Sequence, residues 1–310
     1  RRLFAEGAFN AAFVPLFARH MSEGGKDAAR RFAEEVLSVF VVALLLFVTA
    51  LQVAMPWLMY GFAPGFADDP LRFDLAVALA QITFPYLLFI SLVSQLGGVL
   101  NALGRFAAAA ATPIILNLCL IGALLGLSGF VETPGHALAW GVAAAGAAQF
   151  IWLMIACHRA EFGLRLLRPR LTPRVKRLLI LVLPGAIGAG VVQINLLIDV
   201  VIASLLPRGS VSFLYYADRV NQLPLGVIGV AVGTALLPLL SRQLRAGEHD
   251  NAMGSMNRAM EFALLLTVPA AAALMIIPDG IVAVLFERGA FGTVETAATA
   301  SALAAYALGL

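Results

Sequence analysis

Residues 36–62, VLSVFVVALLLFVTALQVAMPWLMYGF, contain no charged side chain and are long enough to cross a lipid bilayer as one helix. The hydrocarbon core of a bilayer is about 30 Å thick, and a helix needs about 20 apolar residues to cross it. Backbone N–H and C=O groups find no water in that core, so a span must satisfy them internally, as a helix does. The stretch therefore predicts an all-α membrane protein.

Similar apolar runs recur along the whole chain. Of the 310 residues, 61% are hydrophobic and 13% are charged, and the mean hydropathy is +0.92, whereas soluble domains contain about 25% charged residues. We therefore expect one polytopic helical bundle and not several soluble domains. The predicted spans are 3–20, 36–62, 75–103, 107–130, 135–157, 178–206, 211–241 and 259–286, with a ninth beginning near residue 294.

Lys and Arg are distributed unequally between alternate loops. The loops on one side carry fifteen of them, and the loops on the other side carry three, Arg72, Arg208 and Arg288. Because Lys and Arg accumulate in cytoplasmic loops, the first set is predicted to be cytoplasmic and the second to face outward. This distribution explains the formal net charge of +3, which therefore does not imply a nucleic acid partner.

The most basic loop, residues 158–177, contains Pro169 and Pro173 and is predicted to connect two halves of the protein on the cytoplasmic side. Its basic residues suit a topology anchor, and binding of anionic lipid head groups is the alternative. The predicted organisation is a first helical lobe at 1–157, this connector at 158–177, and the start of a second lobe at 178–310.

An internal repeat supports two lobes. VPLFARHMSEGGKDA, beginning at Val14, matches LPLLSRQLRAGEHDN, beginning at Leu237, at a constant offset of 223. Both copies have the same predicted orientation, which indicates a parallel repeat; chance resemblance between two membrane hairpins is the alternative. The second copy has residues before the match that the first lacks, so we expect about 50 residues with one helix before Arg1, and at least two helices after Leu310. The fragment would then be truncated at both ends.

Ionisable side chains within apolar spans are costly and mark candidate functional positions. Arg219, in YYADRVNQLPLG, is the strongest, with Asp218 beside it and Asn221 two residues further on. A guanidinium that lines a polar cavity can bind phosphate oxygens through two parallel hydrogen bonds. An interhelical ion pair, or a residue anchored at the outer interface, is the alternative. Arg1, at the outward half of the first span, suits an interface anchor when considered by itself.

Asp199, in QINLLIDVVIAS, is a weaker candidate for a cation or proton site, together with Gln193 or Asn195, and a polar packing contact is the alternative. The four His residues lie in loops or at span ends, and Cys119 and Cys157 lie in apolar runs that predict buried thiols. The sequence contains no nucleophile motif and no paired metal-ligand spacing. We therefore expect no enzyme, no cofactor and no metal site.

Helix breakers lie within several spans. Pro85, Pro113, Pro184 and Pro224 each interrupt an apolar run and predict kinks, because proline removes a backbone donor. The glycines that follow the last two predict close helix packing and not a phosphate-binding loop, since no strand precedes them. They are Gly185, Gly188, Gly190, Gly226, Gly229 and Gly233.

Six segments together resemble one family in order and in spacing. They are RRLFAEGAFNAAFVPLFARH (1–20), APGF (63–66), ITFPYLLFISL (82–92), LNALGRF (100–106), GSVSFLYYADRVNQLPLGVIGVAVGTALLPLLSR (209–242) and LFERGAF (285–291). They resemble the MurJ (MviN) family of lipid II flippases, and the resemblance covers essentially the whole chain.

The resemblance implies the multidrug/oligosaccharidyl-lipid/polysaccharide exporter superfamily, with two helical lobes around a central cavity and alternating access. It implies transport of lipid II, the undecaprenyl-pyrophosphate-linked muropeptide, across the bacterial inner (plasma) membrane, with membrane lipids and cell-wall synthesis proteins as further partners. It assigns substrate-binding arginines to Arg1 and Arg219, and supporting roles to Glu6 and Asp218. The family's first helix, which carries another cavity arginine, and its last helices are absent here.

Three other interpretations remain open. A drug/cation antiporter of the same superfamily would use carboxylates and aromatic walls in its cavity, which Arg219 disfavours. A flippase for another polyprenyl-linked glycan would share the charge requirement, so only the motifs favour the peptidoglycan precursor. A non-transporting membrane scaffold would be expected to lack an arginine in the middle of a span.

Overall fold

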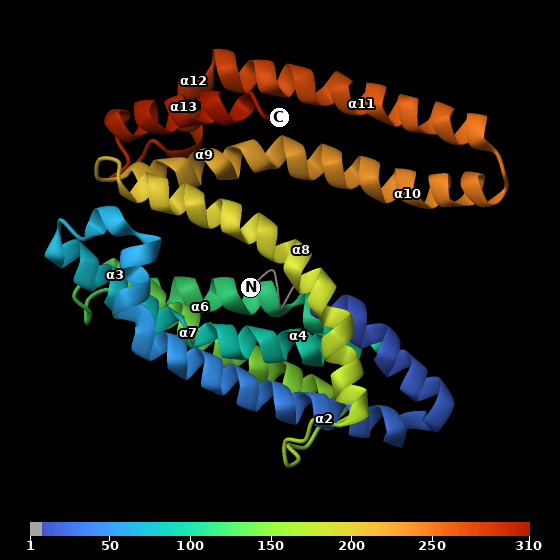
Figure 1. Ribbon diagram of the computed structural model, residues 1–310. Helices are drawn as coiled ribbons and strands as arrows, with labels where there is room; N and C mark the ends of the chain where they lie inside the picture. Colours follow the sequence, from blue (N-terminus) through green and yellow to red (C-terminus); the bar gives the residue numbers. More distant parts are fainter. Residues whose placement is uncertain (1–7) are drawn as a thin grey trace. The chain divides into compact units, whose positions relative to one another are not determined.

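The computed structural model describes residues 8–310, apart from the side chains of Ala8, Ala189, Val191, Val192, Asn195, Val230 and Ala231. Regular structure in this part of the chain is helical, with a single isolated bridge between Arg288 and Phe291 (Figure 1). The chain divides into two compact units, Arg1–Val201 and Ile202–Leu310. The expected all-α class is confirmed.

The first unit contains α2 (Ala8–Phe62), a short 3-10 helix (Pro64–Phe66), α3 (Pro70–Thr83), α4 (Tyr86–Ala102), α5 (Phe106–Ala110), α6 (Thr112–Leu127), α7 (Pro134–Arg159) and most of α8 (Pro173–Ser204). The second contains α9 (Ser210–Pro224), a π-helical turn (Leu225–Gly229), α10 (Val230–Arg245), α11 (His249–Ile276), α12 (Pro278–Phe286) and α13 (Thr293–Ala307).

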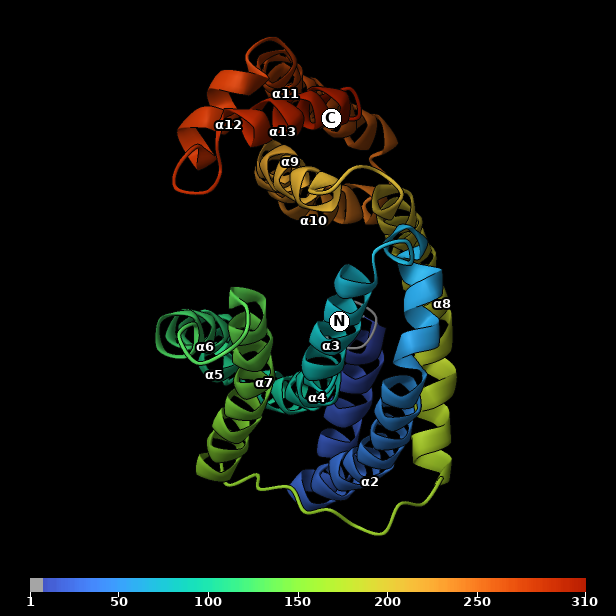
Figure 2. The same ribbon diagram turned by 90° about the vertical axis from the view of Figure 1, so that its left-hand side faces the viewer.

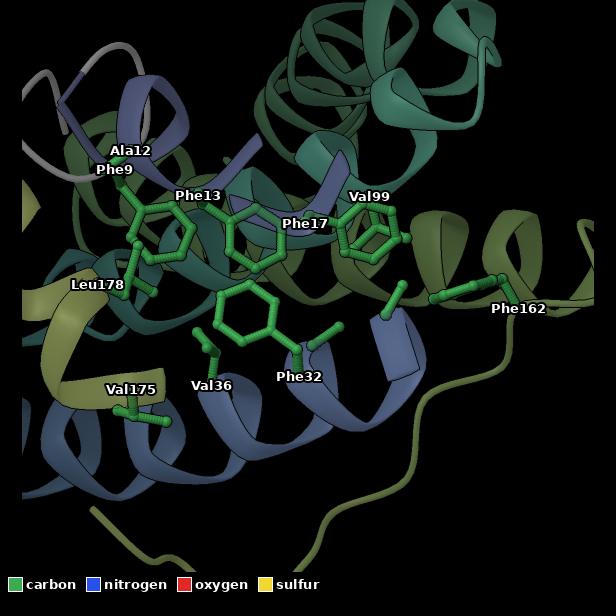
Figure 3. Packing of buried hydrophobic residues seen from close by; sticks show 12 residues of the cluster. Phe9, Ala12, Phe13, Phe17, Phe32, Val36, Val99, Phe162, Val175 and Leu178 are labelled. Carbon is green, nitrogen blue, oxygen red and sulfur yellow. The ribbon is translucent and has the colours of Figure 1, made fainter. Parts of the chain in front are cut away.

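The α2 segment is two helices that fold back on each other at Gly25. This residue has φ 71° and ψ −169°, a conformation that is essentially restricted to glycine. Figure 3 shows Phe13 and Phe17 from the part before Gly25 facing Phe32 from the part after it. The rings of Phe13 and Phe32 stack with their centroids 5.6 Å apart. The buried aromatic cluster thus holds the first hairpin together.

Helix α4 is the most enclosed helix of the first unit, with residues 90–100 all buried between α2 and α7. Its buried Gln95 donates through Nε2 to the carbonyl oxygen of Ala33 at 3.0 Å, and Gln149 of α7 donates to the carbonyl oxygen of Thr112 at 2.7 Å. Gly146 allows close contact with α4, because a Cβ atom there would lie 2.9 Å from the Tyr86 ring. Side-chain amides and small residues therefore join these helices.

The second unit has its own core. Ala217 and Val220 of α9 pack against Val282 of α12 and Leu303 of α13. Tyr216 extends this core, since its ring lies 5.0 Å from that of Phe286 and 5.3 Å from that of Phe291. One face of α9 is thereby fixed against its neighbours.

Six helical segments of the described chain are long and apolar enough to span a membrane. Phe9–Phe62 overlaps the predicted spans 3–20 and 36–62, and each of the other five overlaps one predicted span. The predicted spans 178–206 and from 294 correspond to α8 and α13, which are not among the six. The chain is a multi-pass membrane protein. The boundaries differ in two places. The predicted loop between 20 and 36 is helical on both sides of Gly25, and the predicted span 259–286 begins at His249 and is interrupted at Ile277. Polar residues at span ends continue the helices, because helix formation does not require apolar side chains.

Three of the four prolines predicted to disrupt spans lie at interruptions. α3 and α4 are separated at Phe84 and Pro85, α6 begins beside Pro113, and Pro224 precedes the π-helical turn, whereas Pro184 lies inside the continuous α8. Within the described residues, the predicted close packing is not found at five of these glycines, where an added Cβ would meet no atom within 4 Å. They are Gly188, Gly190, Gly226, Gly229 and Gly233.

Each unit contains one copy of the sequence repeat. In the second copy α10 ends and the chain reverses at Gly247, with φ 76°. The aligned residue of the first copy is Gly24, yet the residue with positive φ is its neighbour Gly25. The two turns are therefore offset by one residue, although both connect a proline-containing helix to the next helix.

The compact units divide at Val201, within α8, whereas the sequence predicted a division at the connector 158–177. The start of α8 belongs to the first unit because Val175 and Leu178 are buried in its aromatic cluster (Figure 3). The functional lobes at 1–157 and 178–310 stay a prediction.

Replacing Gly25 by alanine should destabilise the first unit by about 1–3 kcal/mol, because the Cβ atom disfavours the backbone angles of this turn. Thermal unfolding of the purified protein in detergent would measure the loss. Gly61→Ala is the matched control, since Gly61 is helical with open space around it. Equal melting temperatures for Gly25→Ala and the control would contradict this account of the hairpin.

Candidate functional site

Helix α9 presents two different faces. Ala217 and Val220 are buried in the core of the second unit, while Tyr215 and Arg219 are exposed. Residues four apart lie one above the other on a helix, so Tyr215 and Arg219 share the face that the unit's own core does not cover. The core fixes the direction in which the guanidinium projects.

Arg219 lies nine residues after the start of α9, which corresponds to roughly 14 Å along the helix axis. A bilayer core is about 30 Å thick, and α9 is part of a candidate span, Ser210–Arg245. For a span whose hydrocarbon region begins near Ser210, this distance puts the arginine inside that region. A charge at that depth faces protein or water and not lipid.

The guanidinium of Arg219 is held by neutral groups. Its Nη1 donates to Oε1 of Gln222 at 3.4 Å, and its Cζ lies 4.8 Å from the centroid of the Tyr215 ring. Gln222 in turn donates through Nε2 to Oδ2 of Asp218. Within residues 8–310, Arg219 forms no ion pair with a carboxylate. The positive charge is therefore oriented without being neutralised, which suits an anionic ligand.

Asp218 approaches Arg219 only through Gln222, so the predicted direct support is replaced by a bridge. Asn221 lies two residues after Arg219, about 200° around the helix. Its Oδ1 is buried and has no hydrogen-bond partner among the described residues. The structure does not bring Asn221 to the guanidinium, and its predicted role in the cavity stays a prediction.

The other predicted site residues are not assembled into a site. Asp199 is exposed on α8, as is Gln193, and the side chain of Asn195 is outside the described part of the structure. Arg1 and Glu6 also lie outside the described residues. In residues 8–310, no group of three or more His, Cys, Asp and Glu is placed to hold a metal ion.

The sequence interpretation missed a polar cavity of about 270 Å³ within the first unit. Asn10 of α2 donates through Nδ2 to Oγ of Ser94 on α4 at 3.1 Å, and Asn101 and Thr112 also line the cavity. The Oδ1 of Asn10 is buried without a partner in the described structure. The sequence signal that could have revealed this cavity was a set of amide and hydroxyl residues in otherwise apolar runs.

A second missed feature is the attachment of the basic connector to α2. We call its non-helical part, residues 160–172, the strap. Figure 2 shows the strap running from α7 to α8 and passing below the lower part of α2. Glu34, only 7% exposed, accepts from the backbone N–H of Arg165 at 3.1 Å, and Ser38 accepts from that of Leu167 at 2.7 Å. The buried ring of Phe162 inserts beside Phe17. The strap is bound along its length.

The C-terminal end of the strap is attached to α2 through Glu35. The Thr172 hydroxyl donates to Oε2 of Glu35 at 2.8 Å, and Arg174 lies 3.8 Å from Oε1 of the same carboxylate. The adjacent carboxylates of Glu34 and Glu35 thus hold the middle of the strap and its C-terminal end.

Comparison with known proteins now gives the family. The family model described as "Lipid II flippase MurJ" matches residues 1–310. The chain belongs to the lipid II flippase MurJ family. The resemblance inferred from the motifs is confirmed.

Curated members of the MurJ family align with the whole chain. This chain is 50% identical over 315 residues to the probable lipid II flippase MurJ of Rhizobium meliloti (strain 1021), and it covers 58% of that protein. It is 35% identical over 314 residues to the lipid II flippase MurJ of Burkholderia cenocepacia, and covers 61%. The chain thus spans about six-tenths of the length of the curated relatives it matches.

A solved structure shares the fold. An inward-facing multidrug resistance transporter of the MATE family, from the MOP superfamily, superposes with a TM-score of 0.75 at 16% identity. The match covers 96% of this chain and 67% of the transporter. This similarity shows that the chain shares its helical fold with that transporter.

Removing two of the contacts that hold the strap, with Glu34→Ala and Ser38→Ala together, should expose it to trypsin at Arg165 and Arg170. The charge-assisted hydrogen bond of Glu34 is worth about 1.5–3 kcal/mol and the neutral one of Ser38 about 1 kcal/mol, so their loss would raise the open population roughly tenfold or more. Limited proteolysis of the purified protein would measure the cleavage rate. Glu23→Ala is the control, since Glu23 pairs only with Arg19 in the same helix; an equal rate in both would contradict the assigned attachment.

Proposed function

We propose that this chain is part of a flippase that moves lipid II from the cytoplasmic to the outer leaflet of the bacterial inner membrane, for peptidoglycan synthesis. Membership of the MurJ family supports the substrate class. The observation that carries the proposal for the site is Arg219, an exposed guanidinium that forms no ion pair with a carboxylate in the described structure and lies about 14 Å along the helix from the start of the candidate span Ser210–Arg245.

The chemistry of the substrate explains why such an arginine is needed. A pyrophosphate head group cannot enter hydrocarbon unaided, because an unpaired buried charge costs many kcal/mol. A guanidinium replaces part of its hydration with two parallel hydrogen bonds. Arg219 would bind the pyrophosphate together with Arg1, while the polyprenyl tail stays in lipid. Asp218 and Gln222 would set the orientation of Arg219.

Transport would then follow from alternating access. A head group bound between two lobes favours the state in which both lobes contact it. Closing the cytoplasmic side and opening the outer side moves the head group across the membrane without exposing it to lipid. In this scheme the protein is a transporter that forms and breaks no covalent bond in its substrate.

Other substrates follow from the same chemistry. A flippase for a different polyprenyl-linked glycan would use the same arginines, and the MurJ family model is what favours lipid II. The MATE transporter resembles this chain in fold at 16% identity, and an unpaired arginine is poorly suited to a cationic drug. We therefore place both alternatives behind lipid II transport.

Replacing Arg219 by alanine in the full-length protein should lower the outward exposure of lipid II by roughly tenfold or more, given about 1.5–3 kcal/mol for a charged hydrogen bond. Cells depleted of the native protein and complemented with the variant would be assayed for lipid II at the outer leaflet. Arg219→Lys should retain part of the activity, because the charge remains without the planar fork.

The control is Arg208→Ala, which removes the same charge from the loop before α9. Unchanged outward exposure of lipid II in Arg219→Ala would contradict the proposed role of this arginine. Normal exposure after depletion, with loss of another glycan at the cell surface, would overturn the substrate assignment itself.

Gln222→Leu should reduce transport severalfold while leaving the helix intact, because it removes the bridge that links Asp218 to Arg219. Its bonds are to a guanidinium and a carboxylate, and a hydrogen bond to a charged group is worth about 1.5–3 kcal/mol, less where water competes for it. The same exposure assay measures the effect, and Leu223→Ala, an exposed apolar position next to it, serves as control. An effect of Leu223→Ala as large as that of Gln222→Leu would contradict the positioning role.

A further inference from the structure

The strap combines exposed leucines with unpaired arginines. Leu166 and Leu171 are 67% and 60% exposed. Between them, the guanidinium groups of Arg168 and Arg170 form no ion pair in the described part of the chain. Apolar and cationic side chains that alternate on an exposed segment are typical of a membrane interface, where the first enter the acyl region and the second reach the phosphates.

An apolar groove of about 420 Å³ opens beside the strap, within the first unit. It lies between α2 and the first turns of α8, and Arg170 is at its edge. Its walls are almost entirely hydrocarbon, with members from α2, the strap and α8. They include Val39, Ala43, Leu46, Leu171, Leu179 and Val182. Leu46 and Leu179 are exposed in a span region, so the groove is open to lipid and has the chemistry of an acyl-chain site.

The start of α8 adds an unusual concentration of positive charge. Arg174, Lys176 and Arg177 are exposed in its first turns, and the first turn contains no acidic residue. The partial positive charge of a helix N-terminus disfavours cations there and favours anions. Thr172 already caps the helix, since its Oγ1 accepts from the N–H of Val175.

The neighbouring carboxylate balances only part of this cluster. Glu35 pairs with Arg174 and also accepts from the Thr172 hydroxyl. Arg170 lines the groove and forms no ion pair in the described part of the chain, so an anion would balance its charge.

We propose that this groove is a binding site for one anionic glycerophospholipid of the leaflet on the predicted cytoplasmic side. Its phosphate lies between Arg168, Arg170 and the first turn of α8, and one acyl chain lies in the groove. The proposal rests on two features together, the positive charge of the arginines and the apolar walls of the groove. A soluble phosphate has no acyl chain to fill the groove, and a neutral lipid has no net charge to balance the arginines. The site is separate from Arg219 and does not depend on the transported substrate.

Native mass spectrometry of the full-length protein with added phosphatidylglycerol would test the site. Arg168→Gln with Arg170→Gln should weaken binding of the most tightly held lipid about tenfold or more, as expected for two lost phosphate contacts. Arg242→Gln with Arg245→Gln is the matched control, because it removes two charges from the last turn of α10 on the same predicted side. Ala43→Trp should also weaken binding by filling the groove, whereas Ala50→Trp, on an exposed part of α2 outside it, should not.

Phosphatidylcholine should fail to occupy the site, and inorganic phosphate at millimolar concentration should fail to displace phosphatidylglycerol. If Arg242→Gln with Arg245→Gln weakened phosphatidylglycerol binding equally, the effect would be one of general surface charge, and the proposal would be overturned. Unchanged binding in Ala43→Trp, or displacement by inorganic phosphate, would also overturn it. Preferential displacement by undecaprenyl pyrophosphate would overturn it in favour of a substrate site.

Discussion

The absence of water from the bilayer core is the constraint on which the rest of this structure depends. Backbone groups must be satisfied within each span, which leaves helices as the available structure. Polar side chains must also find partners, and they do so across helices: Gln52 and Gln81 each donate to the backbone carbonyl of the other, joining α2 to α3 at 2.8 and 3.3 Å. With lipid as solvent, such contacts and close packing replace the hydrophobic effect between helices.

The same constraint explains why the charges of this chain are informative. At the membrane surface, Glu34 and Glu35 can form hydrogen bonds with the strap and fix the start of α8 against α2. In the described part of the span Ser210–Arg245, Arg219 contacts the neutral Gln222 and Tyr215, and the carboxylate of Asp218 is linked to it through Gln222. An arginine that is oriented but not neutralised is expensive in a membrane unless a ligand or a water-filled cavity faces it. This difference distinguishes Glu34 and Glu35, whose charges hold the structure together, from Arg219, whose charge is a candidate for binding a ligand.

Much of the fold could be predicted because its signals are local. The length of apolar runs predicted the spans, and Pro85 and Pro224 predicted two of the interruptions. The extension of α2 and α11 through polar residues was not predicted, since hydropathy reports the solvent around a helix and not where the helix ends. At the site, the sequence identified Arg219 and Asp218, but not the bridging role of Gln222, which needs the relative positions of three side chains.

By itself, the sequence determined that this protein is an α-helical membrane protein with a repeated unit, that it carries an arginine inside a span, and that it has the MurJ-family motifs. These properties depend on residue type and on order along the chain. Only the tertiary structure decided that the chain reverses at Gly25 rather than Gly24, that the strap is attached to α2, and that a groove with an arginine at its edge lies beside it. The last two features arise where residues more than a hundred positions apart meet, and nothing in the local pattern of either segment encodes the contact.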